Sequence, residues 1–511
     1  MSDKLPEGWT RVPFSDMITE LRNGISTRPS LEPPGTPILR TSAARPGSVV
    51  LEDRRFLPNG ESLLDTYRLR DGDLVFTRYN GSLDLLGVCG MVRALGEAPL
   101  LYPDKLMRAR VRESLVLPEY VERFFQSPGA RDALVGMAKS SAGQQGISGG
   151  DLKAQAVLLA PLPEQHRIVA RVEALFADVT KAKERLDRVP LILKRFRQAV
   201  LAAACSGELT KEWRDEHPDA ARPTLREPSR EGRRGRRGAN LSGDGILLID
   251  EELPELPDTW MYARLDRLTE PGTVITYGIV LPGPEVDGGV PYVRGQDVED
   301  GRLRTNALRH TTKEIASKHE RSTLLEGDVL LCIIRNLRVA IVPKGLDGAN
   351  ITQGMVRIRP SLAVVLRDFI AYYLMSPLAQ GWMKKRYFGM DMPRINVEDA
   401  RAIPVTLPPI DEQAEIVRQI QKLFALADAI ERRLKTATAR AERLPQAILT
   451  KAFSGELVPT EAELARAEGR GYETATELLA RVRKGSEAAA EPKRAKPLVA
   501  RRRRKVAEEE G

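Results

Sequence analysis

The sequence predicts a mixed α/β (α+β) protein built as a tandem repeat, in which two mixed domains are each followed by a long coiled-coil helix. Three observations lead to this prediction. A 49-residue segment occurs twice, it carries an apolar residue at alternating steps of four and three, and each copy follows a unit with strand-like and helix-like runs. A chain of 511 residues is long enough for roughly two to four domains, each with its own core.

The first variable unit is expected over residues 1–160 and the second over residues 256–408. Strand-like runs at 73–77 (DLVFT) and 328–334 (DVLLCII) follow the turn signals Asp-Gly and Glu-Gly. Helix-like amphipathic runs occupy residues 119–125 (EYVERFF) and 367–375 (RDFIAYYLM). Short echoes link the two units, including LPEGW (5–9) with LPDTW (256–260), and PILR (37–40) with PYVR (291–294). Each unit is therefore expected to fold as a mixed α/β domain.

The repeated segments, residues 161–209 and 409–457, are expected to be the two long helices. They align without a gap, and 19 of the 49 positions are identical, including Glu-Gln near the start and Ser-Gly-Glu-Leu at the end. The 4-3 spacing continues over about five heptads, which is typical of a coiled-coil seam. The seam positions are Ile168, Val172, Leu175, Val179, Ala182, Leu186, Val189, Leu193, Phe196 and Val200, followed in the second copy by Ile416, Ile420, Leu423, Ala427, Ile430, Leu434, Ala437, Ala441, Leu444 and Ile448.

Proline and glycine mark the ends of these helices. Pro161 and Pro409 mark the starts, and Gly207 and Gly455 are expected to be left-handed caps at the ends. Pro190 and Pro445 lie inside the helical runs, where they predict local bends or interruptions.

The remaining segments are rich in charged and small residues. Residues 210–255 are expected to form a linker, and residues 458–511 a largely disordered C-terminal tail with a short helix at 473–483. Basic runs occur in both, at Arg233–Arg237 and Arg501–Lys505. With a formal net charge of +9, they give a modest indication of a polyanionic partner.

Composition argues against a membrane segment and a metal site. No apolar run approaches the roughly 18 residues that a membrane span needs, and no signal segment follows Met1. The three cysteines and four histidines form no ligand-spaced cluster, so neither a disulfide framework nor zinc is expected. These features are typical of a cytoplasmic protein.

Signatures of catalysis are missing from the sequence. It contains no phosphate-binding P-loop, no strand–GxGxxG–helix unit, no nucleophile elbow and no motif for amino-group methylation. The chain is therefore expected to be a binding protein rather than an enzyme, with no catalytic residue, metal or cofactor of its own.

Polar residues follow the predicted strands in both units. Arginine can bond guanine through two hydrogen bonds, asparagine or glutamine can do the same for adenine, and loops at strand ends often display such groups. The alternative is that any one of them is an ordinary solvated or ion-paired surface residue. The candidate DNA-binding residues are Arg40, Thr41, Arg78, Tyr79 and Asn80 in the first unit, and Arg294, Gln296, Arg335, Asn336 and Arg338 in the second.

Taken together, these motifs resemble the specificity (S) subunits of type I restriction-modification systems. The resemblance runs from LPEGW (5–9) to Leu457 and is strongest in PLPEQ (161–165), PPIDEQ (408–413) and the two SGEL helix ends. It implies that the variable units are target recognition domains and that the helices form an antiparallel coiled coil. It further implies that two methyltransferase (M) subunits dock on this core, with restriction (R) subunits joining the complex in defence against phage. The partner subunits would use S-adenosylmethionine, ATP and Mg, and the M subunits would methylate a flipped adenine.

This resemblance implies double-stranded DNA with a bipartite site as the ligand. About 40 helical residues give a spacer of at most roughly 60 Å, compatible with half-sites one DNA turn, roughly 34 Å, apart. Because the units differ in sequence, the two halves of the site are expected to be unlike. Three alternatives remain at this point: the recognition subunit of a type IIB-like system, a coiled-coil spacer that does not read DNA, and an enzyme in its own right.

Overall fold

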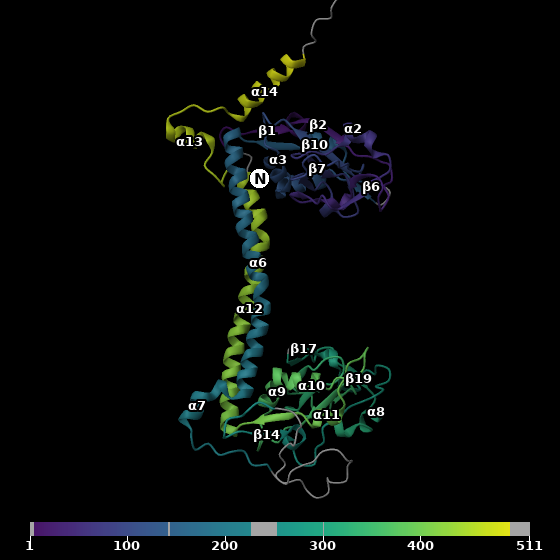
Figure 1. The fold of residues 1–511 in the computed structure, drawn as a ribbon, viewed down its shortest axis with the longest axis vertical. Coiled ribbons are helices and arrows are strands. Elements are labelled where there is room, and N and C mark those ends of the chain that lie inside the picture. Colours follow the sequence, from purple (N-terminus) through teal and green to yellow (C-terminus); the bar gives the residue numbers. More distant parts are fainter. Residues whose placement is uncertain (1–4, 142–143, 226–252, 300, 491–511) are drawn as a thin grey trace, which may run out of the picture. The chain divides into compact units, whose positions relative to one another are not determined.

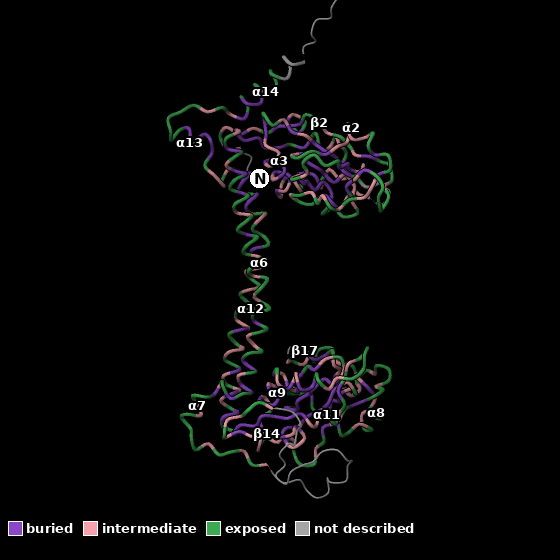
Figure 2. The backbone as a smooth tube through the Cα atoms, viewed as in Figure 1, coloured by how far each residue is buried: buried purple, intermediate pink, exposed green. Residues whose placement is uncertain are grey.

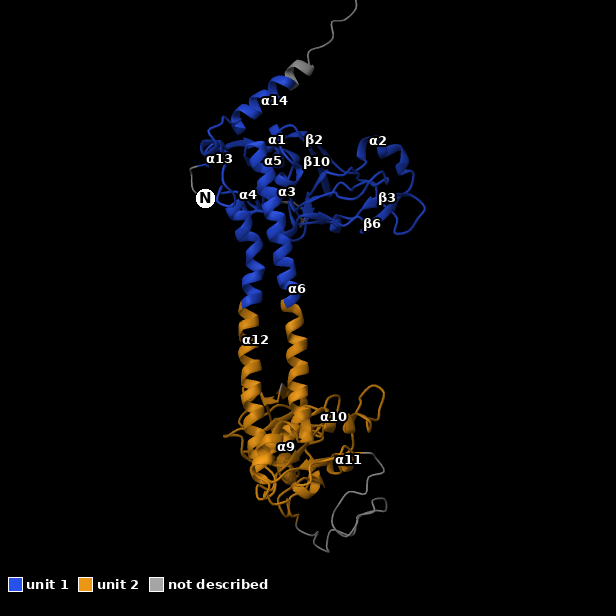
Figure 3. Ribbon diagram, turned by 60° about the vertical axis from the view of Figure 1, so that its left-hand side comes forward, with its two compact units in different colours: residues 1–185, 437–511 blue, residues 186–436 orange. Residues whose placement is uncertain are grey.

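The computed structural model describes residues 5–141, 144–225, 253–299 and 301–490. The chain forms two compact units, unit 1 (residues 1–185 and 437–511) and unit 2 (residues 186–436), coloured separately in Figure 3. Both basic runs, Arg233–Arg237 and Arg501–Lys505, and residues 226–252 of the predicted linker lie outside the described residues. Within the described part of the chain, none of the helices combines the length and apolar character that crossing a bilayer demands.

Unit 1 contains a four-stranded antiparallel sheet in the order β2-β10-β7-β9 (Figure 1). Its strands are β2 (Ile18–Asn23), β10 (Leu106–Val111), β7 (Leu74–Thr77) and β9 (Cys89–Met91). Smaller pairings join β1 (Thr10–Pro13) to β13 (Ala156–Leu159), β3 (Thr36–Leu39) to β6 (Arg54–Leu57), and β4 (Ala44–Arg45) to β5 (Ser48–Val49). β8 (Tyr79–Asn80) pairs with the hairpin of β11 (Lys139–Ser141) and β12 (Gln144–Gly146). The predicted strand at 73–77 corresponds to β7.

Unit 2 repeats this arrangement with the sheet order β15-β23-β20-β21. The strands are β15 (Thr276–Tyr277), β23 (Met355–Ile358), β20 (Val329–Cys332) and β21 (Val339–Ile341). β14 (Met261–Arg264) pairs with β24 (Pro404–Leu407), as β1 pairs with β13 in unit 1. β16 (Val290–Val293) lies between β19 (Arg309–Thr311) and β22 (Asn350–Ile351), and β17 (Val298–Glu299) pairs with β18 (Arg302–Leu303). The shared order shows that the weak sequence echoes reflect one fold used twice.

Two consecutive helices pack on each sheet. They are α3 (Pro118–Gln126) and α4 (Pro128–Gly136) in unit 1, and α9 (Arg367–Met375) and α10 (Pro377–Lys384) in unit 2. Ser127 and Ser376 separate the members of each pair, and each is followed by a proline at the first helical position, where the missing N–H costs nothing. Shorter helices are α1 (Phe14–Met17), α2 (Leu64–Tyr67) and α5 (Gly149–Ala154) in unit 1, and α8 (Lys313–Ser317) and α11 (Val397–Arg401) in unit 2.

The two repeated segments form the long helices α6 (Leu162–Ser206) and α12 (Ile410–Ala452). Gly207 and Gly455 follow them with φ of 86° and 78°, which confirms the predicted left-handed caps. Pro190 and Pro445 lie inside continuous helices, so the expected interruptions are absent. A proline removes one backbone hydrogen bond, and the packing of the remaining turns of a long helix outweighs that loss.

Within each unit the two long helices pack on each other and on the domain core. In unit 1 the first turns of α6, including Val172, share a hydrophobic cluster with Ile448 near the end of α12. In unit 2, Val200 near the end of α6 shares a cluster with Ile416 and Ile420 near the start of α12. As residue numbers rise along α6, those of the partners on α12 therefore fall, so the helices are antiparallel.

The predicted seam is buried near the domains and incomplete elsewhere. Ile168, Val179, Leu193, Ala427 and Ala441 are buried, as expected. Ala182, Ile430 and Leu444 are exposed, contrary to the prediction. Two paired helices cover only a narrow stripe of each other, so positions at its border stay open to solvent. Figure 2 shows this alternation of buried and exposed positions along both helices.

A buried carboxylate and amide tie the start of α6 to the unit 1 domain. The indole Nε1 of Trp9 donates to Glu164 Oε1 at 2.9 Å, and Glu164 is fully buried. The side chain of the neighbouring Gln165 accepts from the backbone of Leu117 and donates to the backbone of Leu115. Burial raises the pKa of Glu164, against the opposing effect of its hydrogen bonds.

Unit 2 contains the same junction at the start of α12. Trp260 Nε1 donates to Glu412 Oε2 at 2.8 Å, and Gln413 bonds the backbone of Leu366 and Val364. Glu412 also accepts from Thr210 and Arg214, at 2.7 and 2.6 Å. In both units, the tryptophan that ends the LPEGW or LPDTW motif therefore bonds the glutamate of the repeated Glu-Gln pair.

The glycine caps belong to the same junctions. A Cβ on Gly207 would lie 2.6 Å from Cγ of Pro257, and one on Gly455 would lie 2.5 Å from Cγ of Pro6. These prolines belong to the LPDTW and LPEGW motifs. Each helix end therefore packs against the segment that carries the junction tryptophan of its own unit.

The C-terminal segment differs from the expectation of a largely disordered tail as far as residue 490. α13 (Glu461–Glu468) and α14 (Ala475–Ala490) pack on unit 1, where Ala475, Leu478 and Leu479 join the main hydrophobic cluster. The backbone N–H of Glu461 donates to Glu164 Oε2 at 2.9 Å. In unit 2 the corresponding place at Glu412 is taken by Thr210 and Arg214, which border and belong to α7 (Lys211–Glu216) in the predicted linker. A few apolar residues are enough to dock a helix whose overall composition is polar.

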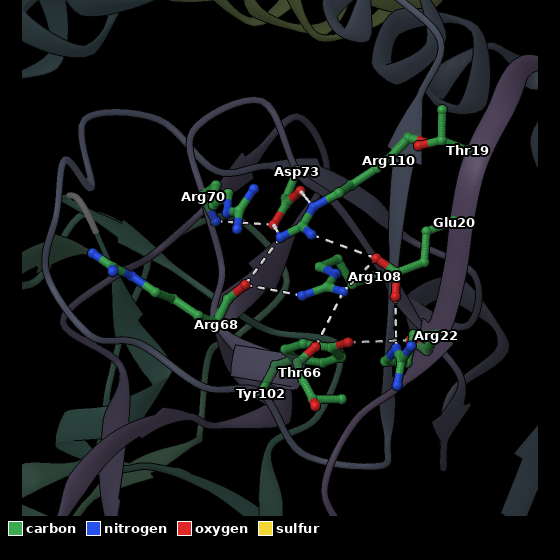
Figure 4. Close-up of polar contacts among 10 residues, drawn as sticks. All are labelled: Thr19, Glu20, Arg22, Thr66, Arg68, Arg70, Asp73, Tyr102, Arg108 and Arg110. Atoms are coloured by element: carbon green, nitrogen blue, oxygen red, sulfur yellow. Dashed lines mark hydrogen bonds and ion pairs between the residues drawn. The ribbon is translucent and has the colours of Figure 1, made fainter. Parts of the chain in front are cut away.

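Several arginines bind carboxylates and backbone oxygens around the sheet. Figure 4 shows that Arg108 and Arg110 of β10 point toward Glu20 and Asp73, and that both donate to the backbone oxygen of Arg68. Arg108 binds Glu20 at 2.6 Å, and Arg110 binds Asp73 through two hydrogen bonds of 2.7 and 3.1 Å. In unit 2, Arg359, which directly follows β23, binds Asp328 through two bonds of 2.8 Å. This network fixes the first residues of the central strand in both units.

We expect Gly455→Ala to lower the free energy of unfolding by about 1–3 kcal/mol, because alanine is strained at positive φ and its Cβ would collide with Pro6. Gly485→Ala is the control in the same unit. Gly485 lies inside α14 with open space around it, so alanine should raise stability by up to about 1 kcal/mol. Urea unfolding of the full chain measures both. Equal effects of the two substitutions would contradict the assigned cap.

Glu412→Gln should destabilise unit 2 by about 2–4 kcal/mol, because an amide cannot accept from three donors or balance the charge of Arg214. Glu431→Gln on the same helix is the control, since its exposed pair with Arg197 is worth less than about 1 kcal/mol. Urea unfolding followed by tryptophan fluorescence compares them. If the control is as damaging as Glu412→Gln, the junction does not have the importance assigned to it.

Candidate nucleic-acid interface

The candidate residues after β7 and β20 lie at the end of each sheet that is remote from the helix junction. In unit 2 the register pairs Cys332 with Met355 and Val329 with Ile358. The chain that leaves β23 after Ile358 reaches Val364, which contacts the junction through Gln413. Residues after Cys332 therefore lie at the opposite end. The pairing of Thr77 with Leu106 gives the same result in unit 1.

In unit 1 the strand-end loop presents three different polar groups. Arg78, Tyr79 and Asn80 are half-buried, and the Arg78 guanidinium stacks over the Tyr79 ring at 4.7 Å from its centroid. Asn80 Oδ1 accepts from the backbone N–H of Ser82, which stabilises a turn directly after β8. A guanidinium held over an aromatic ring is restrained in position before a ligand binds.

In unit 2 the corresponding loop carries Arg335, Asn336 and Arg338. Asn336 Oδ1 accepts from the backbone of Arg338, the same turn as at Asn80. Arg335 has φ of +67°, a strained conformation for a residue other than glycine, and its side chain is exposed. Among the described residues it has no acidic partner within ion-pairing distance. Of the candidates, Arg335 is therefore the most available for a ligand.

Arg40 and Arg294 occupy equivalent positions and are both engaged within the protein. Each precedes a short 3-10 helix, which contains Thr41 in unit 1 and Gln296 in unit 2. Arg40 pairs with Asp53 at 3.2 Å, while Arg294 binds Asp297 through two bonds of 3.0 and 2.9 Å. The Asp297 carboxylate raises the pKa of Arg294. A ligand at Arg294 would compete with this carboxylate.

The two candidate segments of unit 2 lie next to each other. Arg338 Nη1 donates to the backbone oxygen of Val298 at 2.9 Å, which places the loop after β20 beside the 3-10 helix that contains Gln296. Gln296 itself is exposed, and its backbone oxygen accepts from Arg304. Arg335, Arg338 and Gln296 are all exposed and have no ion pair among the described residues. Arg338 is bonded to Val298, and the Gln296 amide lies 3.1 Å from the Arg294 guanidinium, so Arg335 is the least engaged of the three.

The sequence did not predict the hairpin that lies beside the strand-end loop in each unit. In unit 1, Gln145 of β12 pairs with Asn80. In unit 2, residues 386–394 form a hairpin in which Phe388 and Arg394 are bridged, and Arg394 is also bridged to Ile334. The available signal was their common position just before the capped helices α5 and α11, whose caps are Ser148 and Asn396.

An open cavity of about 390 Å³ lies between this hairpin and the sheet of unit 2. Tyr277 and Phe388 supply aromatic walls, and the polar lining residues are Gln353, Arg394, Asn396 and Glu398. Aromatic faces stack on bases, and amide or guanidinium groups bond base edges. Arg335 directly follows the lining residues Ile333 and Ile334, and its backbone N–H donates to the backbone oxygen of Pro393.

The described residues give little support for reactive thiols or a metal site. Burial raises the pKa of Cys205 and of Cys332 to about 12, so both thiols remain protonated near neutral pH. Across the described ranges of the chain, no group of three or more histidine, cysteine, aspartate or glutamate side chains is arranged to hold a metal ion.

Comparisons with known proteins show what the chain is similar to. Residues 283–438 match the family model described as "Type I restriction modification DNA specificity domain". The chain is 46% identical over 229 residues to the EcoKI specificity subunit of Escherichia coli strain K12, an alignment that covers 43% of this chain and 49% of that protein. It is 30% identical over 457 residues to the EcoBI specificity subunit of Escherichia coli, with 88% and 86% covered.

The fold agrees as well. The HsdS subunit from Thermoanaerobacter tengcongensis superposes with a TM-score of 0.55 at 19% identity, covering 89% of this chain and 99% of that one. The alignment with the EcoBI subunit spans most of both chains at 30% identity. This chain belongs to the family of type I restriction enzyme specificity subunits.

Proposed function

We propose that this chain is the DNA sequence-recognition subunit of a type I restriction-modification complex and reads a bipartite double-stranded target. The observation that carries the proposal is that one scaffold occurs twice and ends in chemically different loops. The equivalent positions after the central strands are Arg78 and Tyr79 in unit 1, and Ile333 and Ile334 in unit 2. Residues 1–160 and 256–408 are the proposed target recognition domains.

The candidate side chains suit reading of base edges. Arg335 and Arg78 can bond guanine through two hydrogen bonds, and Asn80, Asn336 and Gln296 can bond adenine. Thr41 and Tyr79 offer hydroxyls to base or phosphate, and Arg40, Arg294 and Arg338 can contact phosphates if DNA displaces their internal partners. Phosphate contacts set the position of the protein on the duplex, whereas the base contacts give specificity.

Exposed apolar residues on the long helices support docking of two methyltransferase (M) subunits. Leu191, Ile192 and Leu426 are exposed within the helical part of unit 2, where a soluble helix would ordinarily carry polar residues. Restriction (R) subunits would join the same complex. The partner subunits would bind S-adenosylmethionine, ATP and Mg, and this chain, without a cofactor of its own, would supply recognition in the cytoplasm.

The alternative functions have less support. The similarity to specificity subunits of type I enzymes does not favour the recognition subunit of a type IIB-like system or a spacer that does not read DNA. A spacer also gives no reason for an exposed arginine held at positive φ in the loop after β20. An enzyme in its own right would need catalytic groups that the sequence motifs do not supply.

Mapping methylated adenines in the host genome, with and without the gene for this chain, tests the proposed function. We expect one bipartite motif with unlike halves to lose methylation when the gene is deleted, because the two strand-end loops differ in their chemistry. Unchanged methylation would contradict a specificity subunit. A palindromic motif would contradict the assignment of one unlike half to each unit.

Arg335→Ala should weaken binding to one half-site by about 5–100-fold, and Arg78→Ala should do so for the other half-site. Competition binding of the assembled complex to duplexes with one altered half measures this. Arg321→Ala is the matched control, because this arginine is exposed in the same unit near Thr323, at the junction end of the sheet. Equal weakening on all DNA, with a smaller salt dependence, would show that Arg335 contacts phosphate instead.

A further inference from the structure

The hairpin of residues 386–394 in unit 2 is held in a fixed conformation. Phe388 and Arg394 exchange two backbone hydrogen bonds of 3.0 Å, and the backbone N–H of Arg335 donates to Pro393 at 2.7 Å. Gly389 closes the turn with φ of +89°. The tip, Gly-Met-Asp-Met-Pro, is therefore attached at its base to the loop that carries the most available candidate for base reading.

This tip presents apolar side chains to solvent. Met390 is 100% exposed, and Phe388 and Met392 are also exposed. Met390 gains nothing for folding, because it remains entirely in water in the free protein, while Phe388 and Met392 keep 44% and 41% of their surface exposed. Exposed apolar groups that are held in place mark a site that is buried by a partner.

The charges around the tip favour DNA as that partner. In the sequence Lys384, Lys385 and Arg386 precede the tip and Arg394 follows it, and Asp391 is the one acidic residue between positions 384 and 394. Lys384 and Lys385 are exposed, and the Arg394 guanidinium lies 4.9 Å from the centre of the Phe388 ring. An apolar point with cations before and after it in the chain is suited to a duplex, whose phosphates bind the cations while the apolar side chains contact the bases.

We propose that Met390 and its neighbours form a wedge that inserts between base pairs in the half-site read by unit 2 and partly unstacks them. This proposal rests on the proposed function. Methionine and phenylalanine side chains act in this way in proteins that kink DNA, and the energy of deforming a given base step contributes to specificity. In unit 1 the position of Phe388 is occupied by Lys139, which is exposed and pairs with Asp151. The distortion should therefore be confined to one half of the target.

The test uses the chain assembled with its methyltransferase subunits, and a duplex that carries the target found by methylation mapping. 2-Aminopurine, placed at successive steps of each half-site, reports unstacking by a rise in fluorescence. Flipping of the methylated adenine by an M subunit unstacks that base in both halves. At the other steps we expect a rise in one half-site only. Met390→Ala should abolish it and weaken specific binding roughly tenfold, while the salt dependence stays the same because no charge is removed. Leu362→Ala is the control, since Leu362 is an exposed apolar residue of unit 2 that follows β23 at the junction end.

Three outcomes would overturn the wedge. Unchanged fluorescence and affinity in Met390→Ala, with normal target binding by the complex, would refute the wedge and leave the recognition function intact. Loss of assembly with the methyltransferase subunits would show that the tip contacts protein. If the unaltered complex binds no specific target, both the wedge and the proposed function fail. Because Met390 is fully exposed, its substitution by alanine leaves the core unchanged, and loss of folding does not confuse these results.

Discussion

The fully buried carboxylate at the start of each long helix is the contact on which the rest of the structure depends. Glu164 and Glu412 could not be buried as charges without donors, and the indole N–H of Trp9 and Trp260 provides one donor each. The adjacent glutamines then bond backbone groups of the loop between sheet and helix. A domain attached through buried, directional bonds has one orientation on its helix, which hydrophobic packing alone would define less sharply.

This attachment leaves the opposite end of each sheet free to differ. Arg110 binds Asp73 in unit 1, and Arg359 binds Asp328 in unit 2. These pairs fix the first residues of the central strands. The central strands β7 and β20 are therefore held in the same way in the two units, although the loops that follow them differ. The turn at Asn80 and the turn at Asn336 are alike in their hydrogen bonding, yet one is preceded by Arg78 and Tyr79 and the other by Arg335. The scaffold is constant and the displayed chemistry is not.

The sequence predicted those features that depend on local pattern. The heptad spacing and the duplicated motifs identified both long helices, and the glycines identified their caps, because these follow from periodicity and from backbone preferences. It failed where tertiary contacts decide. The ordered helices after residue 458 depend on Ala475, Leu478 and Leu479 meeting the core of unit 1. Whether Arg294 faces a ligand or an internal carboxylate likewise depends on Asp297, three residues on, having its side chain turned back.

The sheet end at the helix junction is alike in the two units, and the opposite end carries loops that differ. This separation explains how the loops can change without disturbing the junction. Changes at sites that share no contacts contribute to free energy independently. The loops that contain Arg78 and Arg335 follow the end of each sheet that is remote from the residues bonded by Gln165 and Gln413. Under the proposed function, a substitution in one loop therefore alters base preference in one half-site, while the junction of that unit and the other unit's half-site preference are unchanged.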